Sequence, residues 1–171
     1  MTRPAFIALD LDDTMYGYAT CHAAATQAAE LAIADRYSLQ LETIKEVFAK
    51  SRLATKNRLG SAAASHSRLF YFKLTLENLG LANHLDFALQ LEATYWGTFI
   101  RKMVRAPGLT EVLEICRQEA IPVFVMTDLT AQIQIRKLSR LQVLDHISGL
   151  VTSEEVLEDK PAGDFFGYAR E

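Results

Sequence analysis

The chain has few cysteines and no long apolar run. Its 171 residues include two cysteines, Cys21 and Cys116, which lie far apart with no clustered His or Cys beside them. That spacing favours two small core residues over a disulfide or a zinc site. No apolar segment reaches the roughly 20 residues of a membrane-spanning helix, and residues 1–4 do not begin a secretory signal. We therefore expect a soluble, cytoplasmic protein that makes no membrane contact.

A strong excess of one charge is also lacking. Lys and Arg number 18 against 21 Asp and Glu, so the formal net charge is −3. Such a balance gives no long-range attraction to nucleic acid or to an anionic bilayer. Half of the residues are hydrophobic, as in globular domains rather than disordered chains. A nucleic-acid partner is not expected, and any anionic ligand has to be held by a local site.

Short apolar runs alternate with helical patterns in two parts of the chain. Ala5–Leu9, Pro122–Met126 and His146–Thr152 are predicted strands, and continuous apolar character is typical of strands buried on both faces. Helical spacing of apolar residues covers Leu109–Glu119 and Thr130–Leu141. This alternation predicts an α/β fold with a parallel sheet.

Strand patterns are missing from the segment between the first strand and the rest. Apolar residues there recur at spacings of three and four, which predicts about four helices. We expect an all-helical insertion over 18–105 and a discontinuous α/β core over 1–17 and 106–171. The predicted helices of the insertion cover Cys21–Tyr37, Leu41–Leu59, Ser65–Leu79 and Leu85–Val104.

Polar side chains follow each predicted strand. Asp10 and Asp12 come directly after the first, Thr127 after the second, and Lys160 a short acidic stretch after the third. Taken singly, each is as readily a turn former, a helix cap or a solvated lysine. Because parallel strands place their carboxyl ends at one edge of the sheet, we expect all four to meet there.

These residue types suit phosphoryl transfer. A Mg²⁺ ion bound to Asp10 would neutralise a phosphate dianion, so that Asp10 could attack phosphorus and form an aspartyl-phosphate. Asp12 could protonate the leaving oxygen and then activate water. Thr127 and Lys160 would donate to the phosphate oxygens.

The same residues resemble the motifs of a known family. Asp10-Leu-Asp-Asp-Thr14 resembles the first motif of the haloacid dehalogenase-like (HAD) hydrolases, Thr127 their second and Lys160-Pro161 their third. The resemblance implies a three-layer Rossmann-like core, with a helical cap inserted between motifs one and two. It further implies Asp10 as nucleophile, Asp12 as acid/base, and both Asp10 and the Asp12 carbonyl as Mg²⁺ ligands. At position 12 this sequence resembles the phosphatases of the family, which have an aspartate there, whereas the dehalogenases proper lack it.

Two features depart from the family pattern. Asp128 follows Thr127 where the family usually has asparagine; we group Asp128 with the phosphate-binding residues and expect its carboxylate to point away. The family's fourth, acidic motif lies on a further strand, whereas only residues 162–171, a predicted helix, follow here. We therefore expect a core truncated at its C-terminus, with weak Mg²⁺ binding. The exposed apolar edge at Phe6–Leu9 could then pair in a homodimer.

The substrate is predicted to be a small phosphorylated metabolite, a sugar phosphate or a nucleotide. Basic residues near Gly60 are the sequence features that suit such an anionic substrate, namely Lys56, Arg58, His66 and Arg68. His66 and Arg68 are the candidate substrate contacts, although such residues usually face solvent. Tyr16 and Tyr18 are placed at the site entrance. Two alternatives stay open: a catalytically silent binding or regulatory protein of the same fold, and a sugar phosphomutase.

Overall fold

The structure, a computed structural model, describes residues 3–156, 159–161 and 167. The chain divides into two compact units, one formed by Met1–Ala19 with Met103–Glu171 and the other by Thr20–Lys102. These divisions lie close to those expected after residues 17 and 105. Apart from Gly167, the predicted helix over 162–171 falls outside the described residues.

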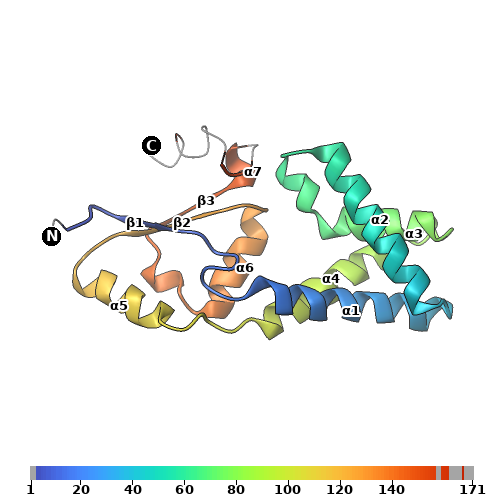
Figure 1. Cartoon of the computed structure of the whole chain (residues 1–171), viewed down its shortest axis with the longest axis horizontal. Helices are drawn as coiled ribbons and strands as arrows, with labels where there is room; N and C mark the ends of the chain where they lie inside the picture. Colours follow the sequence, from blue (N-terminus) through green and yellow to red (C-terminus); the bar gives the residue numbers. More distant parts are fainter. Residues whose placement is uncertain (1–2, 157–158, 162–166, 168–171) are drawn as a thin grey trace. The chain divides into compact units, whose positions relative to one another are not determined.

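The first unit contains a parallel three-stranded sheet in the order β1-β2-β3. Ile7 pairs with Val123, and Thr127 pairs with Thr152. Helices α5 and α6 connect successive strands and lie on the same side of the sheet (Figure 1), as right-handed crossovers in one direction require. The predicted parallel α/β core is confirmed. Its elements are β1 (Ile7–Leu9), α5 (Leu109–Gln118), β2 (Val123–Thr127), α6 (Ala131–Leu141), η2 (Leu144–His146), β3 (Gly149–Thr152) and α7 (Ser153–Val156).

Two strand predictions need correction. β1 is not buried on both faces: Ala8 is exposed and Phe6 is 56% exposed, because among the described residues α5 and α6 cover one side of the sheet (Figure 1). β3 begins at Gly149 rather than His146, because Leu144–His146 form a 3₁₀ turn. Gly149 allows close packing, since a Cβ there would meet the Phe124 ring at 2.8 Å.

The second unit consists of helices joined by turns, with no strand among its residues 20–102. Its buried side chains include an aromatic cluster in which Tyr95 contacts Phe72, Trp96 and Phe99. Trp96 is 3% exposed, so these rings form the core of the unit. No helix in the described part of the chain is long and apolar enough to cross a bilayer. The helices are α1 (Tyr18–Tyr37), α2 (Leu41–Leu59), η1 (Ala63–His66), α3 (Arg68–Asn78) and α4 (Leu85–Lys102).

Candidate active site

The carboxyl ends of the three strands bring Asp10 and Lys160 into contact. Asp10 follows β1 directly, and Lys160 lies beyond β3 and α7. The Lys160 Nζ atom donates to Asp10 Oδ1 at 2.6 Å and to the Met126 carbonyl oxygen, near the end of β2, at 2.9 Å. The Asp10 side chain is 39% exposed and that of Lys160 is 21% exposed. An ion pair thus stands at the sheet edge where solvent reaches it.

Asp12 has a different pair of partners, which no sequence pattern predicted: Lys137 and Tyr16. Lys137 Nζ donates to Asp12 Oδ1 at 2.7 Å and to Oδ2 at 2.9 Å. The Tyr16 hydroxyl donates to Asp12 Oδ1 at 2.6 Å. Tyr16 is 1% exposed, so its predicted place at the site entrance is wrong: it is a core residue whose hydroxyl reaches Asp12.

Thr127 lies beneath the surface at 1% exposure, beside Gln134 of α6. Gln134 Nε2 donates to Thr127 Oγ1 and to the Asp128 carbonyl oxygen, both at 2.6 Å. Since Thr127 Oγ1 accepts from Gln134, its own hydroxyl hydrogen has, among the described residues, a long 3.4 Å contact to the Asp128 carbonyl oxygen. That hydrogen can therefore turn toward a bound anion.

Three acidic residues that follow β2 or β3, namely Asp128, Glu154 and Glu155, have structural partners. The Asp128 Oδ1 atom accepts the backbone N–H of Lys160 at 2.9 Å. Glu154 accepts the N–H of Ala131 at the start of α6, where a carboxylate is favourable. Glu155 accepts both the N–H and the hydroxyl of Thr152. Among the described residues, no group of three or more His, Cys, Asp or Glu is placed to hold a metal ion.

His66 and Arg68 belong to the second unit. Arg68 is 6% exposed; its Nη1 donates to the His66 carbonyl oxygen, and its Nη2 donates to the Tyr95 hydroxyl at 3.3 Å. The guanidinium carbon also lies 4.9 Å from the centre of the Trp96 ring. Arg68 thus holds part of the helical core together, and a substrate contact by His66 or Arg68 stays a prediction.

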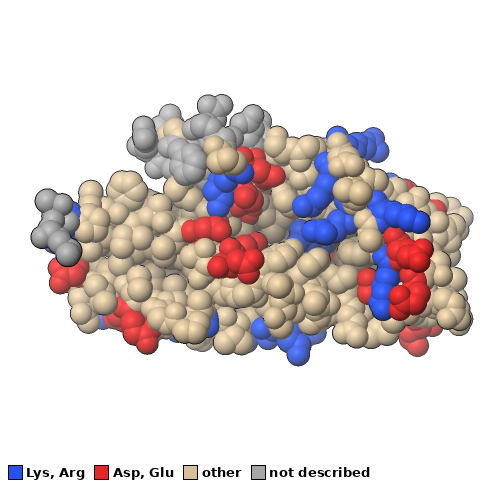
Figure 2. All heavy atoms as spheres, viewed as in Figure 1, with Lys and Arg blue, Asp and Glu red and all other residues tan. Residues whose placement is uncertain are grey.

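The basic residues near Gly60 do not form one group. Positive charge from Lys56 and Arg68 acts on His22, whereas Arg58 lines a separate groove between α2 and α3. Residues two apart on a helix point to different faces, which is why Lys56 and Arg58 separate. Figure 2 shows many Lys and Arg side chains over the second unit on the face drawn.

His22 makes the stability of the second unit sensitive to acid. Burial, first, and then the charges of Arg68, Arg52 and Lys56 lower the pKa of His22 to about 4, from 6.5. Between pH 6.5 and 4, His22 therefore binds a proton in the unfolded chain but stays neutral in the folded chain. The free energy of unfolding consequently decreases as the pH falls. Because His22 is only partly buried, we expect a loss of about 1 kcal/mol.

Thermal melts of the wild type and of His22→Gln across this pH range test the prediction. The melting temperature of the variant should fall less steeply between pH 6.5 and 4. Parallel curves for the two proteins would show that His22 is not the group responsible.

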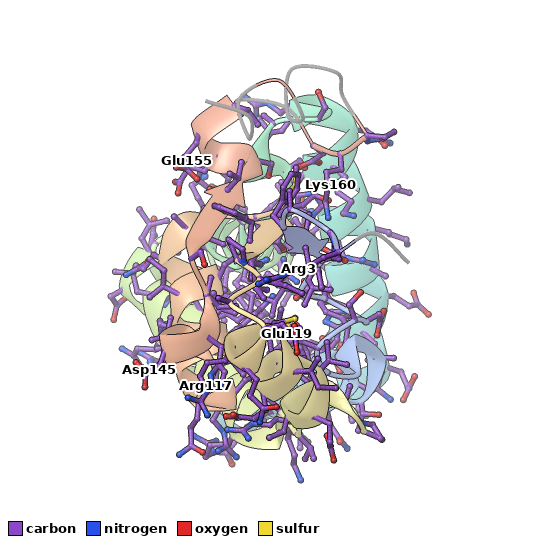
Figure 3. All side chains as sticks on the ribbon, turned by 90° about the vertical axis from the view of Figure 1, so that its left-hand side faces the viewer. Arg3, Arg117, Glu119, Asp145, Glu155 and Lys160 are labelled. Carbon is purple, nitrogen blue, oxygen red and sulfur yellow. The ribbon has the colours of Figure 1, made fainter. Side chains whose placement is uncertain are left out.

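Two hollows have linings made of other residues. One, of about 460 Å³, is lined by α2 and α3 side chains including Arg58, Lys73 and Glu77. The other, of about 300 Å³, is lined by residues that precede β2 and β3, including Arg117 and Asp145. Figure 3 shows Arg117 and Asp145 in the lower part of the view and Lys160 in the upper part. Neither hollow includes Asp10, Asp12, Thr127 or Lys160.

Comparisons with known proteins agree on one family. The family model for haloacid dehalogenase-like hydrolases matches residues 7–171. A ribulose-1,5-bisphosphate 5-phosphatase from Halopiger xanaduensis is 35% identical over 161 residues, which cover 94% of this chain and 67% of the relative.

Solved structures show the same fold at lower identity. A 2-haloacid dehalogenase from Pseudomonas syringae superposes with a TM-score of 0.71 at 18% identity, covering 96% of this chain and 70% of its own. A HAD hydrolase from Bacillus subtilis bound to magnesium superposes with a TM-score of 0.63 at 17% identity, covering 98% and 72%. At such identities the likeness concerns the fold and does not separate phosphatases from dehalogenases.

Proposed function

The chain belongs to the haloacid dehalogenase-like hydrolases, and on that basis we propose that it hydrolyses a phosphomonoester through an aspartyl-phosphate on Asp10. The observation that carries the proposal is the contact between Lys160 Nζ and Asp10 Oδ1 at 2.6 Å. It places a carboxylate beside a positive charge at a partly exposed sheet edge. A nucleophile and a charge that stabilises phosphate oxygens need this arrangement.

In the first half-reaction, an Asp10 carboxylate oxygen forms a bond to phosphorus while the bond from phosphorus to the ester oxygen breaks. The leaving oxygen takes a proton from the Asp12 carboxyl group. In the second half-reaction, Asp12 accepts a proton from water, and the water oxygen bonds to phosphorus as the Asp10–phosphorus bond breaks. Phosphate leaves, and Asp12 again carries the proton.

The phosphate group would meet the exposed Asp10–Lys160 pair first, because Thr127 lies beneath the surface. Lys160 would donate to phosphate oxygens, and the hydroxyl hydrogen of Thr127 would complete the site. Asp128 carries an acceptor-only carboxylate when ionised, so it serves phosphate binding indirectly. By holding the Lys160 N–H at 2.9 Å it positions the lysine.

Magnesium fits the oxygen donors at this edge. Mg²⁺ commonly uses one or two carboxylates together with substrate phosphate and several waters. The partly exposed Asp10 carboxylate and the Asp12 backbone carbonyl are the residues that would hold it, which needs no larger acidic cluster. When bound, the ion would neutralise phosphate charge and so allow an anionic nucleophile to approach.

The substrate class proposed is a small sugar phosphate. The support is the 35% identity to a relative whose name gives a sugar bisphosphate as substrate. Nucleotides, the other substrate class that the sequence predicts, are the second candidate. A homodimer through the β1 edge and a cytoplasmic location stay predictions.

Phosphate release from a panel of sugar monophosphates, sugar bisphosphates and nucleotides, at saturating Mg²⁺, tests the function. Release from at least one class, with the alcohol as co-product, supports a phosphatase. Formation of an isomeric sugar phosphate without release would show a phosphomutase. A complete lack of turnover, with retained ligand binding, would instead favour the silent binding protein.

Replacing Lys160 by methionine should lower kcat/KM by about 10²-fold, because the variant keeps much of the side-chain length but loses the charge beside Asp10. Lys102→Met is the matched control, since Lys102 is exposed at the end of α4 and belongs to the second unit. Steady-state kinetics on the best panel substrate measure both. Equal rates for the two variants would remove Lys160 from the mechanism.

A further inference from the structure

Helix α6 carries two polar side chains on the face it buries. Gln134 and Lys137 are both 0% exposed and share that face with Leu138 and Leu141. Residues 134, 137, 138 and 141 follow the i, i+3, i+4, i+7 spacing of one helix face. An isolated ammonium group is costly to bury, so Lys137 has to be compensated by a nearby acceptor.

That acceptor is the Asp12 carboxylate, 125 residues away in the sequence. Lys137 Nζ lies 2.7 Å from one carboxylate oxygen and 2.9 Å from the other, so it straddles the group. The Tyr16 hydroxyl adds a third hydrogen bond, to Oδ1. Three donors on two oxygens leave the carboxylate plane little freedom to rotate.

Both donors are themselves held in place. Lys137 is enclosed by the core, and its ammonium lies 5.7 Å from the centre of the Tyr16 ring. Tyr16 is buried, and its backbone forms bridges to Asp12 and to Arg105. By contrast, the Asp12 side chain is 32% exposed. The partly exposed Asp12 side chain is thus held by two buried side chains, those of Lys137 and Tyr16.

We propose that Lys137, from the buried face of α6, is a positioning residue that holds the Asp12 carboxyl group in the place where it exchanges protons with the leaving oxygen and with water. Lys137 is not a catalytic residue, since Asp12 stands between it and the reacting atoms. The inference rests on the proposed function, because it concerns the acid/base of that reaction. An exposed carboxyl group without this anchor would sample several rotamers, and fewer would suit proton transfer.

The competing interpretation is a purely structural ion pair that joins α6 to the loop after β1. The two interpretations differ in how they depend on the leaving group. Misplacing the acid slows the release of a basic alkoxide, which needs a proton, but hardly affects nitrophenolate, which leaves without one. General structural damage lowers the rates of both substrates together.

The experiment compares kcat/KM for an alkyl phosphate and for p-nitrophenyl phosphate, because kcat/KM reports the step that phosphorylates Asp10. Lys137→Met should lower kcat/KM for the alkyl phosphate about 10- to 100-fold, part of the ~10²- to 10⁴-fold that a general acid contributes. For p-nitrophenyl phosphate the loss should be under about threefold. Arg136→Met, at the neighbouring exposed position of α6, is the matched control and should leave both rates unchanged.

A double-mutant cycle with Asp12→Ala decides whether Lys137 acts through Asp12. If it does, adding Lys137→Met to Asp12→Ala should cause no further loss with either substrate. A further loss equal to that in the wild-type background would overturn the proposal. So would an equal loss for both substrates in the single variant.

Folding is checked by thermal melts of every variant. Should Lys137→Met fail to fold, Tyr16→Phe removes one of the three hydrogen bonds and should show the same selective loss for the alkyl phosphate, to a smaller degree. Equal rates of Tyr16→Phe and wild type on both substrates would then count against the proposal. Failure of the proposed function itself is distinct: the wild type would hydrolyse neither substrate.

Discussion

Replacing Asp10 by asparagine is expected to abolish phosphate release, lowering kcat by about 10⁴-fold or more, as losses of covalent nucleophiles do in other hydrolases. Asparagine keeps the size of the side chain but offers no anionic oxygen to phosphorus. The variant therefore cannot form the aspartyl-phosphate that water hydrolyses in the second half-reaction. The measurement is phosphate release on the best substrate of the panel, with mass spectrometry of the quenched protein to detect phosphate bound to Asp10.

The matched control is Asp13→Asn, the same chemical change in the same loop. The Asp13 carboxylate accepts the N–H of Tyr18 at 2.7 Å, a bond that an asparagine oxygen can also accept. Its backbone has a positive φ of 59°, which asparagine tolerates. We expect release within about threefold of wild type, since such a surface change disturbs little. Unchanged release in Asp10→Asn would remove Asp10 from the mechanism and, with it, the aspartyl-phosphate.

Removing Mg²⁺ should have the next largest effect, a loss of about 10³-fold in phosphate release. Without the ion, two anions approach each other, and the charge of Lys160 beside Asp10 offsets their repulsion less well than Lys160 and Mg²⁺ together. Protein dialysed against a chelator and then titrated with Mg²⁺ gives the dependence. Adding Ca²⁺ instead should restore little, because it is larger and prefers more ligands in a less regular geometry.

A thermal melt of the dialysed protein separates loss of chemistry from loss of fold. Lys160 donates directly to Asp10, and this contact needs no metal ligand, so the melting temperature should change little on dialysis. Full release from metal-free protein would rule out the magnesium role while leaving Asp10 as nucleophile untouched. The two predictions can therefore fail independently.

The arrangement of Asp10 and Lys160 could be foreseen because it follows from local patterns. Each lies beyond the end of an apolar strand, and parallel strands end at the same edge of a sheet. The same logic placed Thr127 at the end of β2, where the structure has it. It could not reveal that Thr127 is buried beside Gln134, since burial depends on how α6 packs.

Lys137 was missed although a signal was present. Gln134 and Lys137 occupy positions that the helical spacing of Leu138 and Leu141 assigns to the core. Polar residues on a buried face need partners, so this interruption could have pointed to a polar network at the sheet edge. The basic residues near Gly60 show the opposite case: Lys56 and Arg58 are close in sequence, but residues two apart on a helix point to different faces, so α2 turns Arg58 away from Lys56.

The order of strands and helices, and the chemistry their ends carry, follow from the amino-acid sequence alone, because apolar periodicity and turn residues act over a few neighbouring positions. The partners of each reactive side chain were decided only by the tertiary structure. Asp12 meets Lys137 across 125 positions, and a hydrogen bond of 2.7 Å depends on how a helix docks on a sheet. Had α6 packed on the sheet with another face, the Lys137 ammonium would lie in water. No local sequence pattern shows which helix face packs against which carboxylate.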